Sequence, residues 1–148
     1  MVLQTQIFDT AGDAGKALAE RILDLYGASD VANPFLLGCP GGRSPQPVYA
    51  ALAEMACDRV LDLSRLVIVM MDEYVSVTND GSFLMPPPEA HYSCRGFGQR
   101  DILGMINLGL AAKKQITDEH FWMPDLDYPK AYDDKFAAAG GIDFFILA

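Results

Sequence analysis

The chain has 148 residues, of which 51% are hydrophobic and 21% are charged, and its formal net charge is -9. This composition excludes an intrinsically disordered tail, and the length suits one domain or part of a larger one. The acidic balance, together with the absence of any run of Lys and Arg, argues against nucleic acid as a partner.

The first predicted helix follows Asp9 and Thr10, either of which can cap it. Apolar side chains then recur at a spacing of three to four residues until Gly27 interrupts the pattern. The segment from Phe35 to Leu37 is a short apolar run, which predicts a buried strand.

A glycine-rich loop from Gly38 to Ser44 joins this strand to a second predicted helix, which Ser44 would cap and Pro45 would begin. Backbone N–H groups, a hydroxyl and a helix N-terminus converge in such a loop, which predicts an anion site. The loop matches neither a P-loop nor G-x-G-x-x-G, so we expect a sugar phosphate rather than a nucleotide. The alternative is a tight glycine turn with a simple cap. The candidate phosphate-binding residues are Gly41, Gly42, Arg43 and Ser44.

The next strand, Leu66 to Met71, is apolar on both faces and is therefore predicted to lie in the centre of a parallel sheet. Asp72 and Glu73 follow it directly, and a carboxylate at the carboxyl end of such a strand faces the crevice where ligands bind. We therefore predict both as catalytic residues, with Asp72 as a general base that burial near Met70 and Met71 would tend to protonate. The alternative is that Asp72 belongs to a loop turn and that Glu73 is solvated.

The remaining elements are predicted from turn residues and helical spacing. Residues 76–90 contain Asn-Asp-Gly and three consecutive prolines, which predicts a long exposed loop, either a lid or a neutral surface excursion. Helices are expected over residues 91–108 and 128–139, and a final strand is expected over 142–148.

This alternation predicts an α/β fold, with a doubly wound, mainly parallel open sheet and helices on both faces, as in Rossmann-like proteins. The last strand looks buried, and neither a loop nor a covering helix follows it within residues 1–148. We therefore expect one α/β domain truncated at its C-terminus, the N-terminal part of a longer domain, with an edge strand as the alternative. An uncovered strand would also expose apolar surface and allow a homo-oligomer.

Several other classes of protein are disfavoured. A helix that spans a bilayer needs about 20 apolar residues, and no apolar stretch of the sequence is that long. The N-terminus also lacks the features of an export signal. We therefore expect a cytoplasmic protein without membrane contact. Cys39, Cys57 and Cys94 have no metal-ligand spacing, which predicts free thiols and no metal site. His91 and His120 are isolated and are interpreted as surface or packing residues.

The chain resembles the family of glucosamine-6-phosphate deaminases and 6-phosphogluconolactonases. The family's phosphate loop and following helix resemble LLGCPGGRSPQPVYAALAEM, and its strand with the catalytic acid resembles VIVMMDEYV. Two later segments, HYSCRGFGQRDI and KAYDDKFAAAGGIDFFILA, are also similar. Asp-Glu-Tyr at 72–74 is similar to the deaminase branch, whereas Gly-Gly-Arg-Ser-Pro at 41–45 is closer to the lactonases. We favour the deaminase branch because the acid would touch the reacting carbons.

The resemblance implies aldose–ketose isomerisation with deamination, from glucosamine 6-phosphate to fructose 6-phosphate and ammonia, without a cofactor. Asp72 would match the family's base, Glu73 would support the loop rather than react, and Gly41 to Ser44 would match the phosphate loop. The family also uses a Gly-x-Asp-Gly-His motif for ring opening, and these 148 residues do not contain it. Hydrolysis of a phosphosugar lactone and a non-catalytic sugar-phosphate-binding module are the alternatives.

Overall fold

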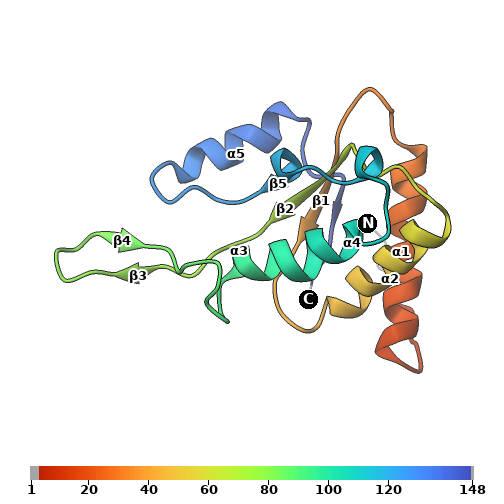
Figure 1. Ribbon diagram of the computed structural model, residues 1–148, viewed down its shortest axis with the longest axis horizontal. Coiled ribbons are helices and arrows are strands. Elements are labelled where there is room, and N and C mark those ends of the chain that lie inside the picture. The colour runs from red at the N-terminus through yellow and green to blue at the C-terminus, as the bar shows by residue number, and fades with distance from the viewer. Residues whose placement is uncertain (1–3, 148) are drawn as a thin grey trace.

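A parallel sheet forms the centre of the computed structural model, which describes residues 4–147 (Figure 1). Its strand order is β5-β2-β1-β6, and every neighbouring pair is parallel. β1 and β2 pair from Phe35 opposite Leu66 to Cys39 opposite Met70, so their carboxyl ends lie side by side. The strands are β1 (Phe35–Cys39), β2 (Leu66–Met70), β5 (Phe121–Trp122) and β6 (Phe144–Phe145).

Helices cover both faces of this sheet, as predicted (Figure 1). One face packs its alternate side chains against α1, α2 and a long helical segment, whereas Leu36, Val67 and Val69 on the other face contact α5 and its flanking residues. The doubly wound α/β prediction is therefore confirmed. The helices are α1 (Ala11–Ala28), α2 (Gln46–Asp58), the segment α3 (Cys94–Phe97), η1 (Gly98–Gly104, π-helical) and α4 (Met105–Asn107), the short η2 (Ala112–Lys114) and η3 (Asp118–His120), and α5 (Pro129–Ala138).

The starts of α1 and α2 differ in how they are capped. The Thr10 hydroxyl accepts a backbone N–H of the first turn of α1 at 3.1 Å. The prediction that Ser44 caps α2 is wrong, because α2 begins at Gln46 and no side chain caps it. The carbonyl of Arg43 accepts the N–H of Gln46 at 3.2 Å in a turn that precedes the helix, and Pro47 has no N–H to satisfy.

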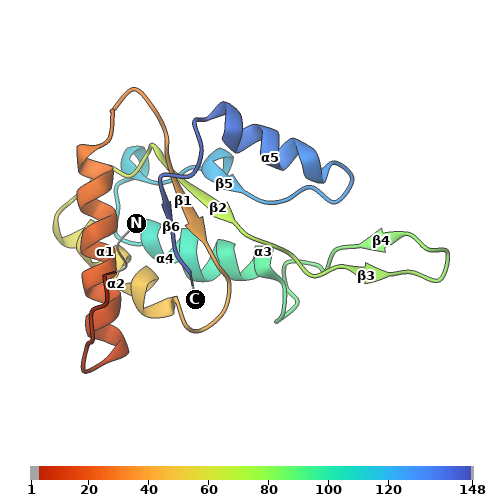
Figure 2. The same ribbon diagram turned by 180° about the vertical axis from the view of Figure 1, so that it is seen from behind.

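Residues 76–90 contain an antiparallel hairpin, which the sequence did not predict. β3 (Ser76–Val77) pairs with β4 (Phe83–Leu84), and the Thr78 N–H donates to the Ser82 carbonyl at 2.8 Å. We call this hairpin the arm, because it extends from the body in opposite views (Figure 1 and Figure 2). Its apolar side chains Val77, Phe83 and Leu84 are 57% to 68% exposed.

The last strand is shorter and less buried than the sequence predicted. Only Phe144 and Phe145 pair with β1, and β6 lies at the edge of the described sheet, where Phe145 is 38% exposed. The carboxylate of Asp143 accepts a hydrogen bond from the N–H of Leu36 at 2.8 Å. This side chain therefore supplies the acceptor that a backbone carbonyl would supply if β6 were longer. Ala148, the end of the predicted strand, lies outside the described residues.

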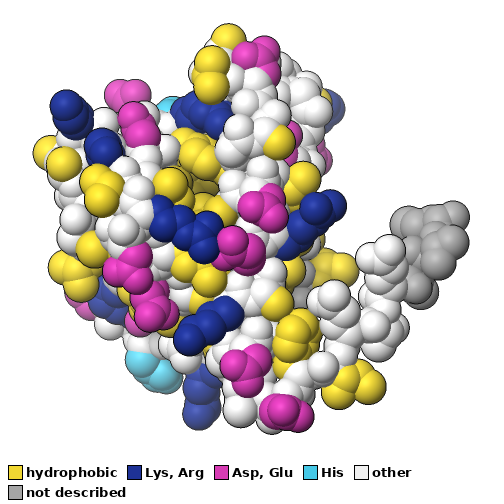
Figure 3. All heavy atoms as spheres, turned by 90° about the vertical axis from the view of Figure 1, so that its right-hand side faces the viewer, with side chains coloured by type: hydrophobic (Ala, Val, Ile, Leu, Met, Phe, Trp, Pro, Cys, Tyr) yellow, Lys and Arg dark blue, Asp and Glu magenta, His cyan; other side chains and the backbone are white. Residues whose placement is uncertain are grey.

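The described surface agrees with the charge pattern of the sequence. On the face shown in Figure 3, Lys and Arg side chains are interspersed with Asp and Glu side chains, and no large basic area appears there. Within residues 4–147, no helix is long and apolar enough to cross a bilayer.

Candidate functional site

A cavity of about 650 Å³ opens at the carboxyl ends of β1 and β2. β1 leads into the glycine-rich loop and β2 leads into Asp72, and both segments line the cavity. Residues 91–94 at the start of α3 and residues 145–147 at the end of β6 complete the lining. Ligands of open parallel sheets bind at this edge, so the fold places the cavity where a site is expected.

The glycine-rich loop is held in a conformation that leaves its backbone donors free. Gly42 has a φ of 96°, which favours glycine, and the Tyr49 hydroxyl from α2 donates to the Pro40 carbonyl at 2.7 Å. Burial raises the pKa of Tyr49 and keeps its hydroxyl protonated. No acceptor among residues 4–147 takes a hydrogen bond from the backbone N–H groups of residues 41–44. With the exposed Arg43 beside them, these donors can bind an anion.

Asp72 lines the same cavity, but it is not desolvated. Its side chain is exposed, so the expectation that Met70 and Met71 would bury it is wrong. Met70 points into the core and is fully buried, while Met71 is itself 39% exposed. The carboxylate of Asp72 is therefore open to both a bound molecule and water, a position from which it can exchange protons with either.

Glu73 faces away from this cavity and holds the start of α3. Its carboxylate accepts the backbone N–H groups of Cys94 and Arg95 at 2.8 Å, the Ser93 hydroxyl at 2.9 Å and the N–H of Tyr74 at 2.9 Å. Burial raises the pKa of Glu73, but the hydrogen bonds from Arg95, Cys94, Tyr74 and Ser93 outweigh burial and lower the pKa below its ordinary value. An ionised carboxylate with these four donors fits a supporting role better than proton transfer.

The predicted site residues thus fall into two groups. Gly41, Gly42 and Arg43 lie around one cavity with Asp72. Ser44 lines a separate hollow between α1 and the start of α2, and Glu73 lines a smaller cavity beside the base of the arm. The structure therefore brings together the anion-binding loop and one carboxylate, and separates the other two predicted residues from them.

None of the aromatic residues that line the cavity was predicted as a site residue, and three of them form a cluster. Tyr92 contacts Tyr74 and His91 edge to face, with ring centroids 6.0 Å and 5.2 Å apart. His91 was interpreted as a surface or packing residue, and it is exposed at the cavity. The sequence signal that could have found Tyr92 and His91 is the segment HYSCRGFGQRDI, whose similarity to the family was noted without roles for its residues.

The thiols near the site are protonated. Burial first, and then the negative charges of Asp72 and Glu73, together raise the pKa of Cys94 to about 11. Burial raises the pKa of Cys39 to about 12, and this fully buried residue packs in the core. Among the residues that the structure describes, no group of three His, Cys, Asp or Glu side chains is arranged to hold a metal ion.

Comparison with curated proteins finds relatives named glucosamine-6-phosphate deaminase. A glucosamine-6-phosphate deaminase of Streptomyces avermitilis is 32% identical over 98% of this chain and 50% of that relative. A glucosamine-6-phosphate deaminase of Bacteroides thetaiotaomicron is 34% identical over 76% of this chain and 38% of that relative. The chain therefore spans half or less of the length of these relatives. No protein-family model matches it.

Solved structures share the fold. A monomeric glucosamine-6-phosphate deaminase, described as a missing link of the NagB superfamily, has a TM-score of 0.73 at 14% identity, over 95% of this chain and 52% of its own. A Neisseria gonorrhoeae protein assigned as a 6-phosphogluconolactonase has a TM-score of 0.53 at 22% identity, over 84% of this chain and 51% of its own. At these identities the likeness establishes the α/β architecture.

Proposed function

Because the chain belongs to the NagB superfamily of glucosamine-6-phosphate deaminases and 6-phosphogluconolactonases, we propose that it serves the deamination of glucosamine 6-phosphate to fructose 6-phosphate and ammonia. One observation carries the proposal: the glycine-rich loop, whose N–H groups donate no hydrogen bond within the described residues, and Asp72 line the same cavity. An anion donor site and a base within one cavity suit a phosphorylated substrate that loses a proton from carbon.

In this proposal the phosphate of the sugar binds at the glycine-rich loop. The backbone N–H groups of Gly41 and Gly42 and the guanidinium of Arg43 donate to its oxygens, as nests of amides do with other phosphates. A volume of about 650 Å³ lies within the range of small-molecule sites and accommodates a hexose phosphate. The sugar chain then extends from the loop toward Asp72.

Asp72 moves a proton between neighbouring carbons of the open-chain sugar. Its carboxylate takes the proton from C2, the C2–H electron pair forms a C1–C2 double bond, and the carbonyl oxygen takes a proton from water, which gives an enolamine and hydroxide. The same carboxyl returns the proton to C1 while the nitrogen lone pair forms a C2–N double bond, and the nitrogen gives a proton to the hydroxide, which leaves an imine at C2. Water adds to this imine and ammonia leaves, so that the ketone forms without a change in overall oxidation state. Because Asp72 is exposed, solvent water can reach the imine beside it.

Two other functions use the same cavity. The Gly-Gly-Arg-Ser-Pro loop at 41–45 and the fold shared with an assigned 6-phosphogluconolactonase favour hydrolysis of a phosphosugar lactone as the second candidate. A binding module without catalysis would need only the loop.

The free thiols Cys39, Cys57 and Cys94 suit a reducing compartment, and a cytoplasmic location is part of the proposal.

Asp72→Asn tests the assignment. We expect ammonia release from glucosamine 6-phosphate to fall by about 10²- to 10⁴-fold, because the amide cannot accept the C2 proton, while the affinity for the sugar phosphate changes little. The matched control is Asp118→Asn, an exposed acid on η3 that does not line the cavity. Turnover retained in Asp72→Asn contradicts the role of Asp72, and lactone hydrolysis without ammonia release selects the second candidate.

A further inference from the structure

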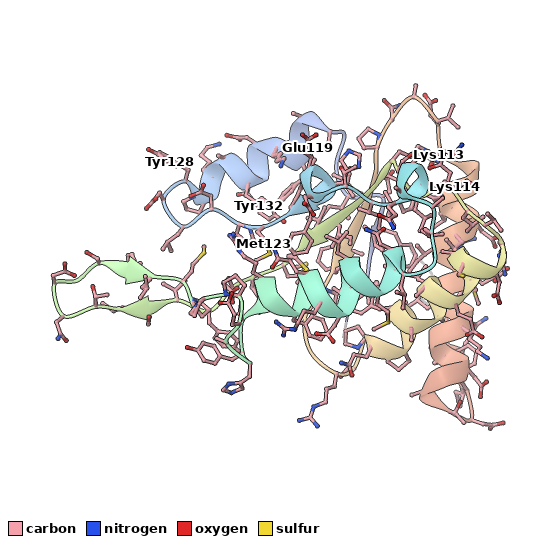
Figure 4. The ribbon with its side chains drawn as sticks, viewed as in Figure 1. Lys113, Lys114, Glu119, Met123, Tyr128 and Tyr132 are labelled. Atoms are coloured by element: carbon pink, nitrogen blue, oxygen red, sulfur yellow. The ribbon has the colours of Figure 1, made fainter. Side chains whose placement is uncertain are left out.

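A hydroxyl from the far side of the sheet reaches the end of β2, two residues before Asp72. Tyr132 lies on α5, and its side chain extends from that helix toward the sheet (Figure 4). The Tyr132 hydroxyl lies 2.7 Å from the carbonyl oxygen of Met70 and 3.0 Å from that of Trp122. One proton is therefore shared between two carbonyls of neighbouring strands.

These carbonyls belong to the ends of the two strands. Met70 is the last residue of β2 and Trp122 is the last residue of β5, and the pairing between the strands ends at Val69 opposite Trp122. The Tyr132 hydroxyl thus joins β2 to β5 at the carboxyl edge of the sheet, beyond the last residue of β2 that pairs with β5. It fixes the direction in which the chain leaves β2.

Asp72 follows Met70 by two residues, and the next residue is also fixed. The Glu73 carboxylate accepts the N–H groups of Cys94 and Arg95 at the start of α3. The backbone that carries Asp72 is therefore held on both sides, by Tyr132 at Met70 and by the α3 contacts of Glu73. Only Met71 and Asp72 lie between the two attachments.

We propose that Tyr132 is a positioning residue for the reaction, which sets the place of Asp72 in the cavity by holding the Met70 carbonyl from the opposite face of the sheet. The kinetic test of this inference rests on the proposed function. The structural test rests on the hydrogen bonds of Tyr132 alone. It gives α5 a part in a site that it does not line.

The hydroxyl and the ring of Tyr132 have separable contributions. The ring packs edge to face on Phe136 of the same helix, with centroids 5.0 Å apart, and belongs to the apolar cluster under α5. Burial raises the pKa of Tyr132, and the nearby Cys39 raises it further, so the hydroxyl remains a donor at neutral pH. Tyr132→Phe therefore removes the two hydrogen bonds and retains the packing.

The experiment compares Tyr132→Phe with Tyr128→Phe in the purified protein. Tyr128 immediately precedes the N-terminus of α5 and is 71% exposed (Figure 4). Its hydroxyl therefore serves as the matched control. In Tyr132→Phe we expect kcat for ammonia release to fall about tenfold or more with KM nearly unchanged, because phosphate still binds while Asp72 is displaced. Tyr128→Phe leaves kcat and KM as in the wild type.

Amide hydrogen exchange gives a second measurement that does not require turnover. We expect exchange at the amides of Val69 and Met70 in β2 and of Trp122 in β5, whose ends the hydroxyl joins, to accelerate about tenfold in Tyr132→Phe and to stay unchanged in Tyr128→Phe, because losing a buried hydrogen bond favours local opening of the strand ends. Unchanged exchange at these residues, or equal losses of kcat and substrate affinity, overturns the positioning role. If the wild type releases no ammonia, the proposed function fails, and the exchange experiment alone decides the role of Tyr132.

Discussion

Asp72 and Glu73 are neighbours in the sequence with opposite surroundings. Asp72 is exposed and lines the large cavity, whereas Glu73 accepts four hydrogen bonds at the start of α3. Of the two acids that follow β2, one thus supplies its carboxylate to the cavity and the other binds the start of α3. The second holds Ser93 and Cys94 in the orientation that forms a wall of the cavity.

Glu73→Gln should lower the free energy of unfolding at neutral pH by about 2 kcal/mol, because an amide cannot accept from all the donors that the carboxylate satisfies. The pKa of Glu73 lies below its usual 4.5 in the folded protein. Its stabilisation is therefore complete above pH 4.5 and is lost as the pH falls through the lowered folded value. Denaturant unfolding between pH 7 and pH 3 measures both effects.

The wild type should lose stability in the acid part of that range, and Glu73→Gln should lack this component. Glu89→Gln is the matched control, because Glu89 is exposed and follows the proline run. Parallel pH profiles for the wild type and Glu73→Gln would show that the four hydrogen bonds do not favour the charged form of Glu73.

At the scale of elements, α3 depends on close contact with the proline-rich segment that follows the arm. A Cβ at Gly96 would lie 1.9 Å from the carbonyl oxygen of Pro88, which also accepts from the Arg100 guanidinium at 3.0 Å. The backbone of this segment can approach the helix only because residue 96 has no side chain. His91 and Tyr92 follow directly, so the same contact positions the aromatic residues of the cavity.

Gly96→Ala should therefore destabilise the protein by about 2 kcal/mol, as overpacking of a close contact does. Gly27→Ala is the opposite case, because Gly27 lies in α1 with nothing within 4 Å of a Cβ. Alanine there should stabilise the protein by about 0.5 to 1 kcal/mol. Thermal unfolding of both variants measures the difference, and similar midpoints would contradict the close contact at Gly96.

At the scale of the whole molecule, the parallel sheet could be predicted from sequence because its central strands are apolar on both faces. Leu66 to Met70 is such a run and forms β2. β5 has only two residues, Phe121 and Trp122, which is too short for periodicity to reveal. The arm was missed because residues 76–90 signal turns more strongly than strands.

The site was predictable only in part. The loop and Asp72 could be found because they follow the two central strands, whose carboxyl ends meet in any parallel sheet. The three partners of Glu73 at the start of α3 lie 20 to 22 residues further along the chain, and the Tyr132 hydrogen bond to Met70 spans 62 residues. No local pattern encodes such contacts, because they depend on how α3 and α5 pack. The exposure of Asp72 depends on the same packing.

Binding of a sugar phosphate should stabilise the folded molecule as a whole. At about one hundred times its Kd, glucosamine 6-phosphate should add about 2.7 kcal/mol and raise the unfolding midpoint by roughly 5 to 10 °C. Glucosamine without phosphate should shift the midpoint much less. In Arg43→Ala, the shift that glucosamine 6-phosphate causes should be smaller than in the wild type. An equal shift by both sugars would contradict phosphate binding at the glycine-rich loop.

The arm has a consequence for the integrity of the chain. Among residues 4–147 it is a two-stranded ribbon without a third strand beside it, and such ribbons are marginally stable by themselves. The turn between β3 and β4 lies remote from the parallel sheet (Figure 1), and Asp80 in this turn is exposed. An endoprotease specific for acidic residues should therefore nick the chain at Asp80 first, and the two pieces should remain associated because β6 pairs with β1 and β5 pairs with β2.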